Sequence, residues 1–341
     1  MEDGKLGVAI HGAGWVAGAH AASWKKNPRV EVVSVSDLDP ARARKLLDER
    51  GLECPIRQDY GDVLGDPRVD VVDVCTPNHL HAEQGIAAAE AGKHVLVEKP
   101  IALSMDGNRA LRDAVARAGV KSMAGFVLRF NPAVRTLKSL LEQRAVGELF
   151  YLEVDYWHGI GPSHHAWGLH SKRKTGGGAM LLGGCHALDL IRFFAGSEVA
   201  EVSAFANNTR GRFEYDANVA AVMKLENGAV AKTAALFDAD MPYQLNIDLA
   251  GTEGTIRDNR VWSKRLFPGQ TDWATVPTIL PNSADVNHHP FDAEMDYFVE
   301  CILEDRQPHC SIADGFRTHE LCLAIDRSIE EGGRPVRLPL E

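Results

Sequence analysis

Short, continuously apolar segments alternate with longer stretches of helical periodicity over the first third of the chain. The short segments predict strands buried on both faces, and the longer stretches predict helices between them. Strands that alternate with helices in this way are typical of a parallel, doubly wound α/β sheet. The expected strands are Leu6–Ile10, Val30–Val35, Val69–Cys75, Val95–Val97 and Lys121–Val127, and the expected helices include Val16–Lys26, His81–Ala91 and Ser104–Ala118.

The pattern of apolar and polar positions changes after about residue 127. A helix is expected to about Leu141, and the segments that follow alternate apolar and polar residues as half-buried strands do. Asn227-Gly228 between two of these segments is a strong hairpin signal. We therefore predict two domains, 1–127 with the parallel sheet and 128–341 with a mostly antiparallel sheet. The expected later strands are 147–154, Val199–Phe205, Asn218–Leu225, Ala229–Leu236 and Gln244–Leu249, followed by helices Pro290–Glu304 and Ile312–Glu331, which could pack back on the first domain.

Composition narrows the class of protein. The 341 residues are 45% hydrophobic and 25% charged, which is ordinary for a globular chain. The net charge of −10 argues against a nucleic-acid or anionic-membrane surface, and neither a basic leader nor a long apolar run is evident, so a cytoplasmic protein is expected. The six cysteines form no Cys-x-x-Cys pair. Buried thiols are therefore expected, not disulfides or a zinc cluster.

A glycine-rich turn directly follows the first predicted strand. Its pattern, Gly-x-Gly-x-x-Ala, precedes a predicted helix whose first amides could bind a pyrophosphate. The second strand ends in Asp37, 23 residues after Gly14, where an acid can accept hydrogen bonds from a ribose. Its charge would repel a 2′-phosphate, so NAD is favoured over NADP. The expected cofactor residues here are Gly12, Ala13, Gly14, Trp15, Val16 and Asp37.

Two later strands also end in polar residues, at the sheet edge where ligands bind in α/β folds. Burial and a neighbouring positive charge can lower a lysine pKa from about 10.4 until the amine shuttles protons, which makes Lys99 a catalytic candidate. The plainer alternative is a solvated surface lysine. The residues expected to contact the cofactor at these strand ends are Thr76, Pro77, Asn78, His81, Glu98 and Lys99.

These motifs together resemble the glucose–fructose oxidoreductase and inositol dehydrogenase family (Gfo/Idh/MocA). The resemblance rests on the glycine turn, Asp37, Thr76-Pro77-Asn78, Gly92-Lys93-His94-Val95 and Glu98-Lys99-Pro100, in this order. It implies a Rossmann domain followed by an α+β domain whose open, mostly antiparallel sheet carries the substrate site and the contacts of a homodimer or homotetramer. It also implies that Lys99 lies between nicotinamide and substrate, and that the Lys99–Pro100 bond is cis.

The segment 176–189 matches the helix on which this family places a catalytic aspartate and, four residues later, a histidine. His186 is that histidine, and a neutral imidazole could accept the proton of a substrate hydroxyl. The plainer alternative is a helix histidine bound to a carbonyl. The aspartate position holds Leu182 instead. Either Asp189 orients the imidazole from the other side, or the site has different chemistry or has lost turnover; Asp189 could equally be structural.

The loop 157–170 contains four histidines and two tryptophans. Aromatic and neutral polar rings suit the surfaces of a sugar, so this loop is expected to line the substrate pocket. No recognised metal-ligand spacing is present, and no metal is expected. The expected substrate residues are Lys99, Arg129, His165, Trp167, His186 and His289, although His289 before a proline could also belong to a turn.

The sequence therefore predicts an NAD-dependent oxidoreductase that acts on a secondary alcohol carbon of a sugar, polyol or related cyclic alcohol. Lys99 and His186 are the expected catalytic residues, with Asp189 as a possible orienting group. One alternative is a glycosidase or lyase that recycles NAD, with Asp155, Tyr156 or a loop histidine as an additional base. Another is a cofactor-binding regulator without turnover, which Leu182 suggests.

Overall fold

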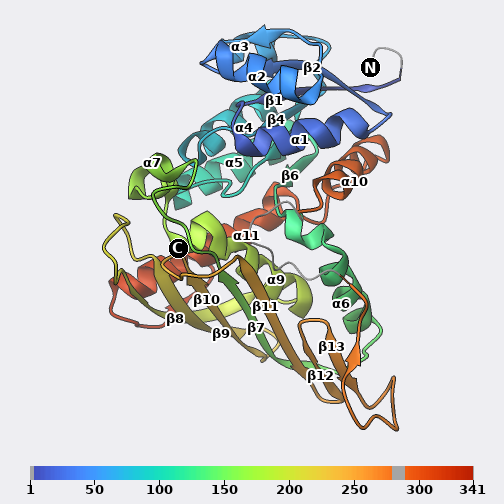
Figure 1. Cartoon of the computed structure of the whole chain (residues 1–341), viewed down its shortest axis with the longest axis vertical. Helices are drawn as coiled ribbons and strands as arrows, with labels where there is room; N and C mark the ends of the chain where they lie inside the picture. The colour runs from blue at the N-terminus through green and yellow to red at the C-terminus, as the bar shows by residue number, and fades with distance from the viewer. Residues whose placement is uncertain (1–3, 279–288, 341) are drawn as a thin grey trace. The chain divides into compact units, whose positions relative to one another are not determined.

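The computed structural model describes residues 4–278 and 289–340 (Figure 1). The chain divides into two compact units, the first made of residues 1–126 and 290–316 and the second of residues 127–289 and 317–341. The first division falls one residue before the predicted boundary. A later segment, 290–316, returns to the first unit, so neither unit is one continuous stretch of chain.

The first unit contains a six-stranded parallel sheet in the order β3-β2-β1-β4-β5-β6. Strand β1 is buried along its whole length, as are the apolar residues of β4 and β5, because helices cover both faces. The predicted doubly wound sheet is thus confirmed, and β3 is an addition. The strands are β1 (Leu6–His11), β2 (Val30–Ser36), β3 (Ile56–Arg57), β4 (Val71–Val74), β5 (His94–Val97) and β6 (Ser122–Ala124).

Local signals explain where the helices of this unit begin and end. Helix α2 (Pro40–Arg50) begins after Asp39, whose side chain accepts a hydrogen bond from the amide of Ala41, and ends at Gly51 in the left-handed region.

Helix α10 (Phe291–Leu303) lies along α1 (Trp15–Lys26), where Ser23 donates to Asp292 at 2.5 Å. The remaining helices are α3 (Tyr60–Leu64), η1 (Asn78–Leu80), α4 (His81–Glu90) and α5 (Met105–Ala118).

The second unit contains a nine-stranded sheet in the order β14-β13-β12-β11-β7-β10-β9-β8-β15. Every pairing is antiparallel except that of β10 with β7, which confirms the predicted mostly antiparallel α+β architecture. The predicted hairpin joins β9 to β10, with Gly228 at φ +89°. The strands are β7 (Leu149–Trp157), β8 (Val199–Asn207), β9 (Asn218–Leu225), β10 (Val230–Leu236), β11 (Gln244–Gly251), β12 (Gly254–Arg257), β13 (Arg260–Ser263), β14 (Ala274–Thr275) and β15 (Val336–Arg337).

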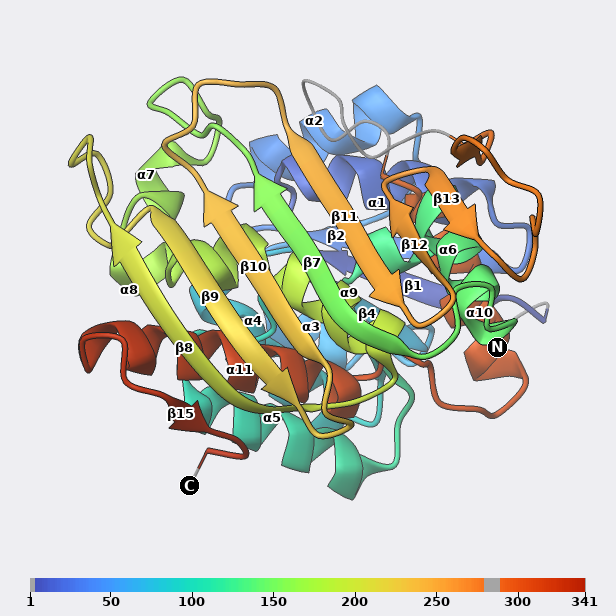
Figure 2. The same cartoon turned by 90° about the horizontal axis from the view of Figure 1, so that it is seen from below.

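The helices of the second unit lie behind the sheet in Figure 2, and the other face of the described strands is uncovered. Helix α9 (Cys185–Ala195) packs against β7 and continues from η3 (Met180–Gly184), a single π-helical turn. Helix α11 (Ile312–Glu330) begins in the first unit and ends in the second. The other described helices are η2 (Val127–Phe130), α6 (Pro132–Glu142), α7 (Trp167–His170) and α8 (Arg173–Gly176).

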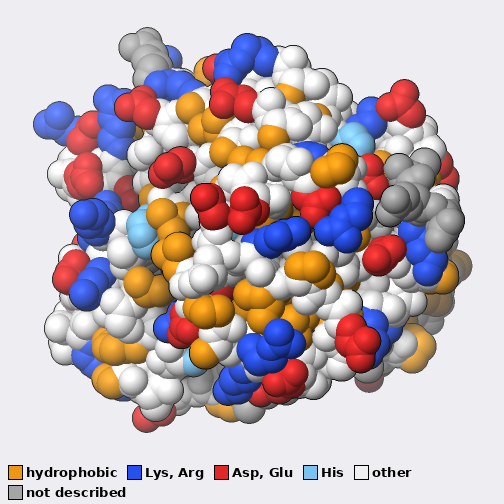
Figure 3. Space-filling view, turned by 90° about the horizontal axis from the view of Figure 1, so that it is seen from above, with side chains coloured by type: hydrophobic (Ala, Val, Ile, Leu, Met, Phe, Trp, Pro, Cys, Tyr) orange, Lys and Arg blue, Asp and Glu red, His pale blue; other side chains and the backbone are white. Residues whose placement is uncertain are grey.

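One stretch of the described chain, Arg173–Ala195, is long and apolar enough to cross a membrane. The sequence alone predicts no such run. Its most apolar window has a mean hydropathy of 1.3 and is 89% buried within the structure, as the core helix of a folded domain would be. On the face seen in Figure 3, basic and acidic side chains are interspersed.

Candidate functional site

The glycine turn after β1 runs directly against the end of β4. Gly12 has φ +99°, and a Cβ there would lie 2.7 Å from the carbonyl carbon and oxygen of Cys75. No other residue could occupy this position without moving the turn. Helix α1 then begins after Gly14, with no side-chain cap and no acid in its first turn. The positive end of a helix that carries no capping side chain is the usual setting for a phosphate group.

Asp37 is the second predicted component of the nucleotide site, after the glycine turn. Its Oδ2 accepts a hydrogen bond from the amide of Ala13 at 2.8 Å, and its Oδ1 accepts one from the amide of Asp39 at 2.9 Å. The carboxylate is therefore held beside the glycine turn, where it can also accept hydrogen bonds from ribose hydroxyls. Arg42, a possible partner for a 2′-phosphate, lies 3.6 Å from the carboxylate of Asp39. These contacts fit NAD better than NADP.

His81 connects the loops that follow β4 and β5. Its Nε2 lies 2.6 Å from the carbonyl oxygen of Thr76, and its Nδ1 lies 2.8 Å from that of Pro100. Burial lowers the pKa of His81, although both carbonyls oppose the shift. The sequence predicted His81 as a cofactor residue. The structure gives this buried ring a further task, because it ties the Thr76 turn to the loop that carries Lys99.

Lys99 follows the carboxyl end of β5 and is partly exposed. Its peptide bond to Pro100 is cis, which confirms the expectation from the family resemblance. Glu98 is buried, and its Oε2 accepts a hydrogen bond from the amide of Lys99 at 3.0 Å. The first unit thus brings the glycine turn, Asp37 and the Lys99 loop to the carboxyl edge of one parallel sheet.

His186 lies in the second unit on the first turn of α9 and is 2% exposed. The Tyr156 ring stacks on it, with 5.9 Å between ring centroids and 22° between planes. Gly183 makes this approach possible, since a Cβ there would lie 2.5 Å from Tyr156 Cε1 and 2.9 Å from Phe237 Cζ. Leu182 is buried in the preceding π-helical turn, a feature frequent at functional sites.

Further rings surround His186. Tyr243 lies 5.2 Å from Tyr156 and 5.3 Å from His158 between ring centroids, and His289 lies 6.3 Å from His186. The Tyr156 hydroxyl is 3.3 Å from Nδ1 of His158. Burial raises the pKa of both Tyr156 and Tyr243, so both phenols stay neutral. We refer to Tyr156, His158, His186, Tyr243 and His289 as the ring cluster.

The two tyrosines were not predicted as part of the primary site. Tyr156 appeared only as an alternative base, and Tyr243 was not singled out. For Tyr156 a signal was available, because the alternation of the β7 segment places it on the same covered face as Leu152 and Val154. Tyr243 precedes β11 in a loop, where periodicity gives no comparable signal.

Asp189 and Arg129 form a buried ion pair. Arg129 Nε donates to Asp189 Oδ2 at 2.7 Å, and Nη2 donates to Oδ1 at 2.5 Å. The side chains are 3% and 2% exposed, and Thr318 also donates to Asp189 at 3.2 Å. From the sequence, Asp189 is either an orienting group for His186 or a structural residue, and Arg129 is expected to contact substrate. The structure pairs these two residues with each other, which agrees with a structural role for Asp189; the roles expected toward His186 and substrate stay predictions.

The predicted substrate residues His165 and Trp167 lie in the loop before α7 and at its start. The His165 ring is 4.2 Å from that of His164, and burial lowers the pKa of His165. Trp167 meets Phe213 edge-on at 4.9 Å. Contacts from Phe213 to Phe237, at 6.3 Å, and from Phe237 to Tyr156, at 6.1 Å, link this loop to the ring cluster.

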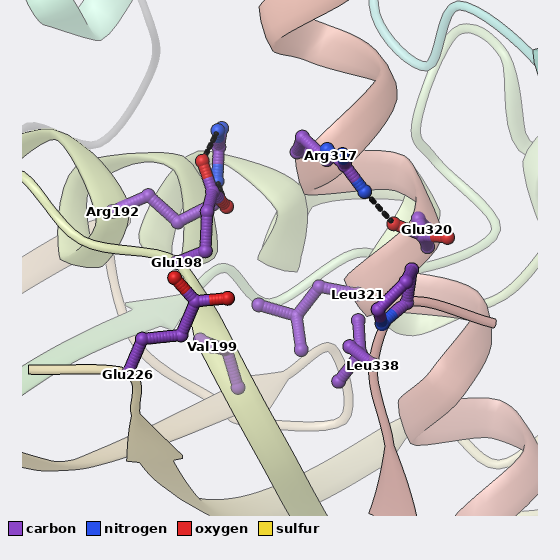
Figure 4. A pocket seen from close by; sticks show the side chains of 9 residues that line it. Arg192, Glu198, Val199, Glu226, Arg317, Glu320, Leu321 and Leu338 are labelled. Atoms are coloured by element: carbon purple, nitrogen blue, oxygen red, sulfur yellow. Dashed lines mark hydrogen bonds and ion pairs between the residues drawn. The ribbon is translucent and has the colours of Figure 1, made fainter. Parts of the chain in front are cut away.

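A separate polar pocket lies at the other end of α9 (Figure 4). Four of its charged residues form two ion pairs, because Arg192 binds Glu198 at 2.6 Å and Arg317 binds Glu320 at 3.1 Å. None of the predicted site residues lines it. The complete lining is Arg192, Glu198, Val199, Glu226, Arg317, Glu320, Leu321, Leu338 and Pro339.

The cysteines are free thiols, five of them buried, as expected. Within the described residues, one group has the composition of a metal site: His20, Asp73 and Cys75 are buried, and their potential ligand atoms lie within 4.8 Å of one another. Hydrogen bonds account for this arrangement. His20 Nδ1 is 2.9 Å from Asp73 Oδ2, and Cys75 Sγ is 3.4 Å from both His20 Nδ1 and Asp73 Oδ1.

Comparison with known families finds matches over both units. Residues 6–126 match the model described as "Oxidoreductase family, NAD-binding Rossmann fold" (GFO_IDH_MocA), and residues 134–257 match the "GFO/IDH/MocA C-terminal domain". The chain is 26% identical over 339 residues to scyllo-inositol 2-dehydrogenase (NAD(+)) of Bacillus subtilis, covering 98% of this chain and 96% of that protein. It is 29% identical over 287 residues to levoglucosan dehydrogenase of Pseudarthrobacter phenanthrenivorans, covering 74% and 73%.

Solved structures show the same similarity. A levoglucosan dehydrogenase in complex with NADH superposes with a TM-score of 0.88 at 26% identity, covering 99% of this chain and 100% of the other. A complex of levoglucosan dehydrogenase with NADH and levoglucosan gives a TM-score of 0.87, also at 26% identity, covering 98% and 100%. The similarity therefore extends over both units.

Proposed function

Because this chain belongs to the Gfo/Idh/MocA family of oxidoreductases, we propose that it acts on a secondary alcohol carbon of a sugar, polyol or related cyclic alcohol. It is an NAD-dependent enzyme of the sugar and polyol oxidoreductase class. The Glu98-Lys99-cis-Pro100 loop carries the proposal, because it places an amine at the same sheet edge as the nucleotide-binding turn.

The residues of the first unit fit NAD. The glycine turn leads directly into α1, the start of that helix favours the charge of a pyrophosphate, and Asp37 is held as a ribose acceptor. Thr76, Pro77 and Asn78 continue the same edge. When bound, NAD would accept the hydride in oxidation of the alcohol, and NADH would supply it in reduction. The residues of the chain then have to orient the substrate and move the proton of its hydroxyl group.

Lys99 and His186 are assigned the proton chemistry. Lys99 polarises the oxygen on the reacting carbon and passes a proton, as a positioned amine can. His186 accepts the hydroxyl proton in oxidation and returns it in reduction. Leu182 cannot orient an imidazole by a hydrogen bond, so we assign this task to ring packing. The Tyr156 face and the Tyr243 and His289 rings restrict how His186 can turn.

The ring cluster also favours a carbohydrate-like substrate. Aromatic faces contact the C–H groups of a sugar, whereas neutral imidazole and phenol groups bind its hydroxyls. His165 and Trp167 extend this lining through Phe213 and Phe237. The names of the relatives, inositol and levoglucosan dehydrogenases, agree with a cyclic compound that bears several hydroxyls.

The first alternative is a glycosidase or lyase that recycles NAD and needs an additional base. Asp155 suits this role poorly, because it projects from β7 on the face opposite Tyr156. Its Oδ1 accepts from the amide of Ala234 at 2.6 Å, and its Oδ2 binds Lys232 at 3.0 Å. The phenol of Tyr156 is kept neutral by burial, so the additional base would have to be a loop histidine such as His158. Release of sugar without NADH would be the distinguishing result.

The decisive experiment incubates the protein and NAD with sugars, polyols, inositols and glycosides, and follows NADH absorbance and free sugar in the same samples. We expect NADH with one substrate group. Lys99→Ala should abolish turnover yet leave NADH binding nearly unchanged. Lys93→Ala is the matched control, because Lys93 precedes the same strand and its Nζ binds the carbonyls of Asp66 and Val69. Wild-type activity in Lys99→Ala would refute the assignment.

The second alternative, a regulator without turnover, is tested by Leu182→Asp. If the leucine at position 182, where the family has an aspartate, has removed activity, Leu182→Asp should raise kcat from an undetectable level. If ring packing orients His186, as we propose, the wild type is active and the buried carboxylate at position 182 only destabilises the protein.

We further propose that the uncovered face of the nine-stranded sheet forms a homodimer or homotetramer contact. Phe205, Val222 and Val230 share this face by strand register, and they are 69%, 56% and 49% exposed. Apolar side chains on such a face favour burial against a second copy. Val222→Lys should lower the mass measured by light scattering, whereas Leu303→Lys, on α10, should not. Cytoplasmic location stays a prediction.

A further inference from the structure

A buried polar chain lies directly behind the Lys99 loop, within the first unit. Its centre is His20 on α1, which is fully buried. His20 Nδ1 is 2.9 Å from Asp73 Oδ2, and His20 Nε2 is 3.1 Å from Glu98 Oε1. Each nitrogen of one imidazole therefore faces a carboxylate.

This arrangement determines the charge of the ring. A neutral imidazole has a single N–H donor, so it could serve only one of the two carboxylates. An imidazolium has two donors and satisfies both. Burial by itself would lower the pKa of His20, but Asp73 and Cys75 outweigh it and raise that pKa well above its ordinary value.

The surroundings of His20 are closed to solvent. Trp24 donates its indole N–H to Asp73 at 2.7 Å, and Phe291 covers the His20 ring at 5.0 Å between centroids. Glu294 of α10 is also fully buried nearby. Burial and the charge of Glu98 raise the pKa of Glu294 well above its ordinary value, so it remains a neutral acid. His20 therefore faces the carboxylates of Asp73 and Glu98, the thiol of Cys75, and a neutral Glu294.

Glu98 connects His20 to the backbone of Lys99. Its Oε1 faces His20, and its Oε2 accepts the backbone N–H of Lys99 at 3.0 Å. The backbone of Gly125 lies against the opposite side of Glu98. A Cβ on Gly125 would be only 3.0 Å from Glu98 Oε1 and 3.2 Å from Glu98 Cα. The carboxylate thus has little freedom, and an ionised carboxylate is a stronger acceptor than a neutral acid.

We propose that His20 is a positioning residue, an imidazolium that holds the side chain of Glu98 in place and, through the hydrogen bond that the Lys99 amide donates to Glu98, fixes the position of Lys99. Neither His20 nor Asp73 is among the site residues that the sequence predicts. The inference rests on the proposed role of Lys99, and it adds that this role depends on a buried charge outside the substrate and cofactor contacts.

The first test compares His20→Gln with the wild type in steady-state kinetics and NADH binding. We expect kcat to fall about 10- to 100-fold, the loss that a small displacement of a catalytic group produces, with a change of less than about threefold in KM or in the Kd for NADH. Glu98→Gln should act similarly. The double variant should be no worse than the poorer single variant, because both substitutions break the same connection.

Ser23→Ala is the matched control. Ser23 lies on the same helix, is buried, and bonds to Asp292 of α10 without touching Glu98. It should lower the melting temperature and leave kcat unchanged. If Ser23→Ala lowers kcat as much as His20→Gln does, His20 is merely structural and the proposal fails. Additive effects of His20→Gln and Glu98→Gln would also overturn it.

A spectroscopic test needs no active variant. In ¹⁵N-histidine-labelled protein without cofactor, both ring nitrogens of His20 should be protonated at pH 8, with the signal assigned by its loss in His20→Gln or, if that variant does not fold, His20→Asn. A neutral ring overturns the proposal, as does stoichiometric zinc bound by His20, Asp73 and Cys75. An active Lys99→Ala would refute the proposed function, whereas an inactive Lys99→Ala with a fully active His20→Gln would refute only this inference.

Discussion

Removal of Arg129 should destabilise the second unit strongly. Arg129→Leu would leave the carboxylate of Asp189 buried, with the hydroxyl of Thr318 still donating to it but without the bidentate guanidinium. Both side chains of the pair are nearly inaccessible, at 3% and 2%. The loss of one partner from such a pair costs about 3–5 kcal/mol, because the remaining charge stays buried without its counter-charge. That is a large share of the roughly 5–15 kcal/mol that stabilises a typical domain.

Urea unfolding, followed by tryptophan fluorescence, measures this loss. With a slope of about 2 kcal/mol per M, the transition of the second unit should move down by roughly 1.5–2.5 M. The double variant Arg129→Leu/Asp189→Leu should recover most of the loss, since an apolar pair of similar volume needs no counter-charge. Arg257→Leu is the control, because its pair with Asp248 in the same unit is exposed and should contribute far less.

The same experiment separates the two roles considered for Arg129. If Arg129 serves a structural ion pair, Arg129→Leu should unfold at a lower urea concentration and the double variant should recover most of the loss. If Arg129 contacts substrate, the urea midpoint of Arg129→Leu should stay unchanged and its KM should rise. A destabilisation below about 1 kcal/mol, the value for an exposed pair, would refute the reasoning from burial.

Three further predictions concern other parts of the site. Gly183→Ala should cost about 1–3 kcal/mol and lower kcat, because its Cβ would displace Tyr156, whereas Gly168→Ala, with no atom within 4 Å, should change neither quantity. Burial lowers the pKa of His11 to about 4, so His11 takes up a proton at a lower pH in the folded protein than in the unfolded chain. As the pH falls from 6.5 to 4, the free energy of unfolding of the wild type should therefore drop by about 3 kcal/mol relative to that of His11→Phe. Urea unfolding of both proteins at each pH measures this difference, and no drop would mean that His11 is solvated. Asp37→Ser should raise the ratio of kcat/KM for NADP to that for NAD roughly tenfold, and an unchanged ratio would exclude Asp37 from cofactor choice.

The sequence predicted the long elements well because each has a strong local cause. Leu6–Ile10 is continuously apolar and became the buried strand β1, and Asn227-Gly228 requires the turn that the hairpin contains. The short strands β3 and β14 were missed. Each has only two residues, so neither hydrophobic period nor β propensity can distinguish it from a loop, and only pairing with a neighbouring strand defines it.

Residues of the site were predictable where a sequence motif determines the backbone conformation. They were less predictable where the contact joins side chains that are far apart in the sequence. The cis bond at Lys99 followed from the resemblance, and Asp37 lies beside the glycine turn that its spacing suggested. Arg129 and Asp189 are 60 residues apart, and no local pattern indicates that they pair. His20 had the same difficulty, since its partners come from β4 and from the end of β5.

The helix that carries His186 shows how packing can replace a charged partner. A carboxylate at position 182 would be about as buried as Leu182, which is 4% exposed, and an ionised group there is costly unless it is paired and hydrogen-bonded. Leu182 avoids that cost, and Gly183 leaves the space in which Tyr156 lies against the imidazole. The Tyr156 ring keeps this contact across the neutral range of pH, because burial keeps its phenol uncharged, whereas a carboxylate orients a histidine only while it is ionised. An acid at position 182 would add its own titration to the pH dependence of the proposed reaction, and Leu182 removes that contribution.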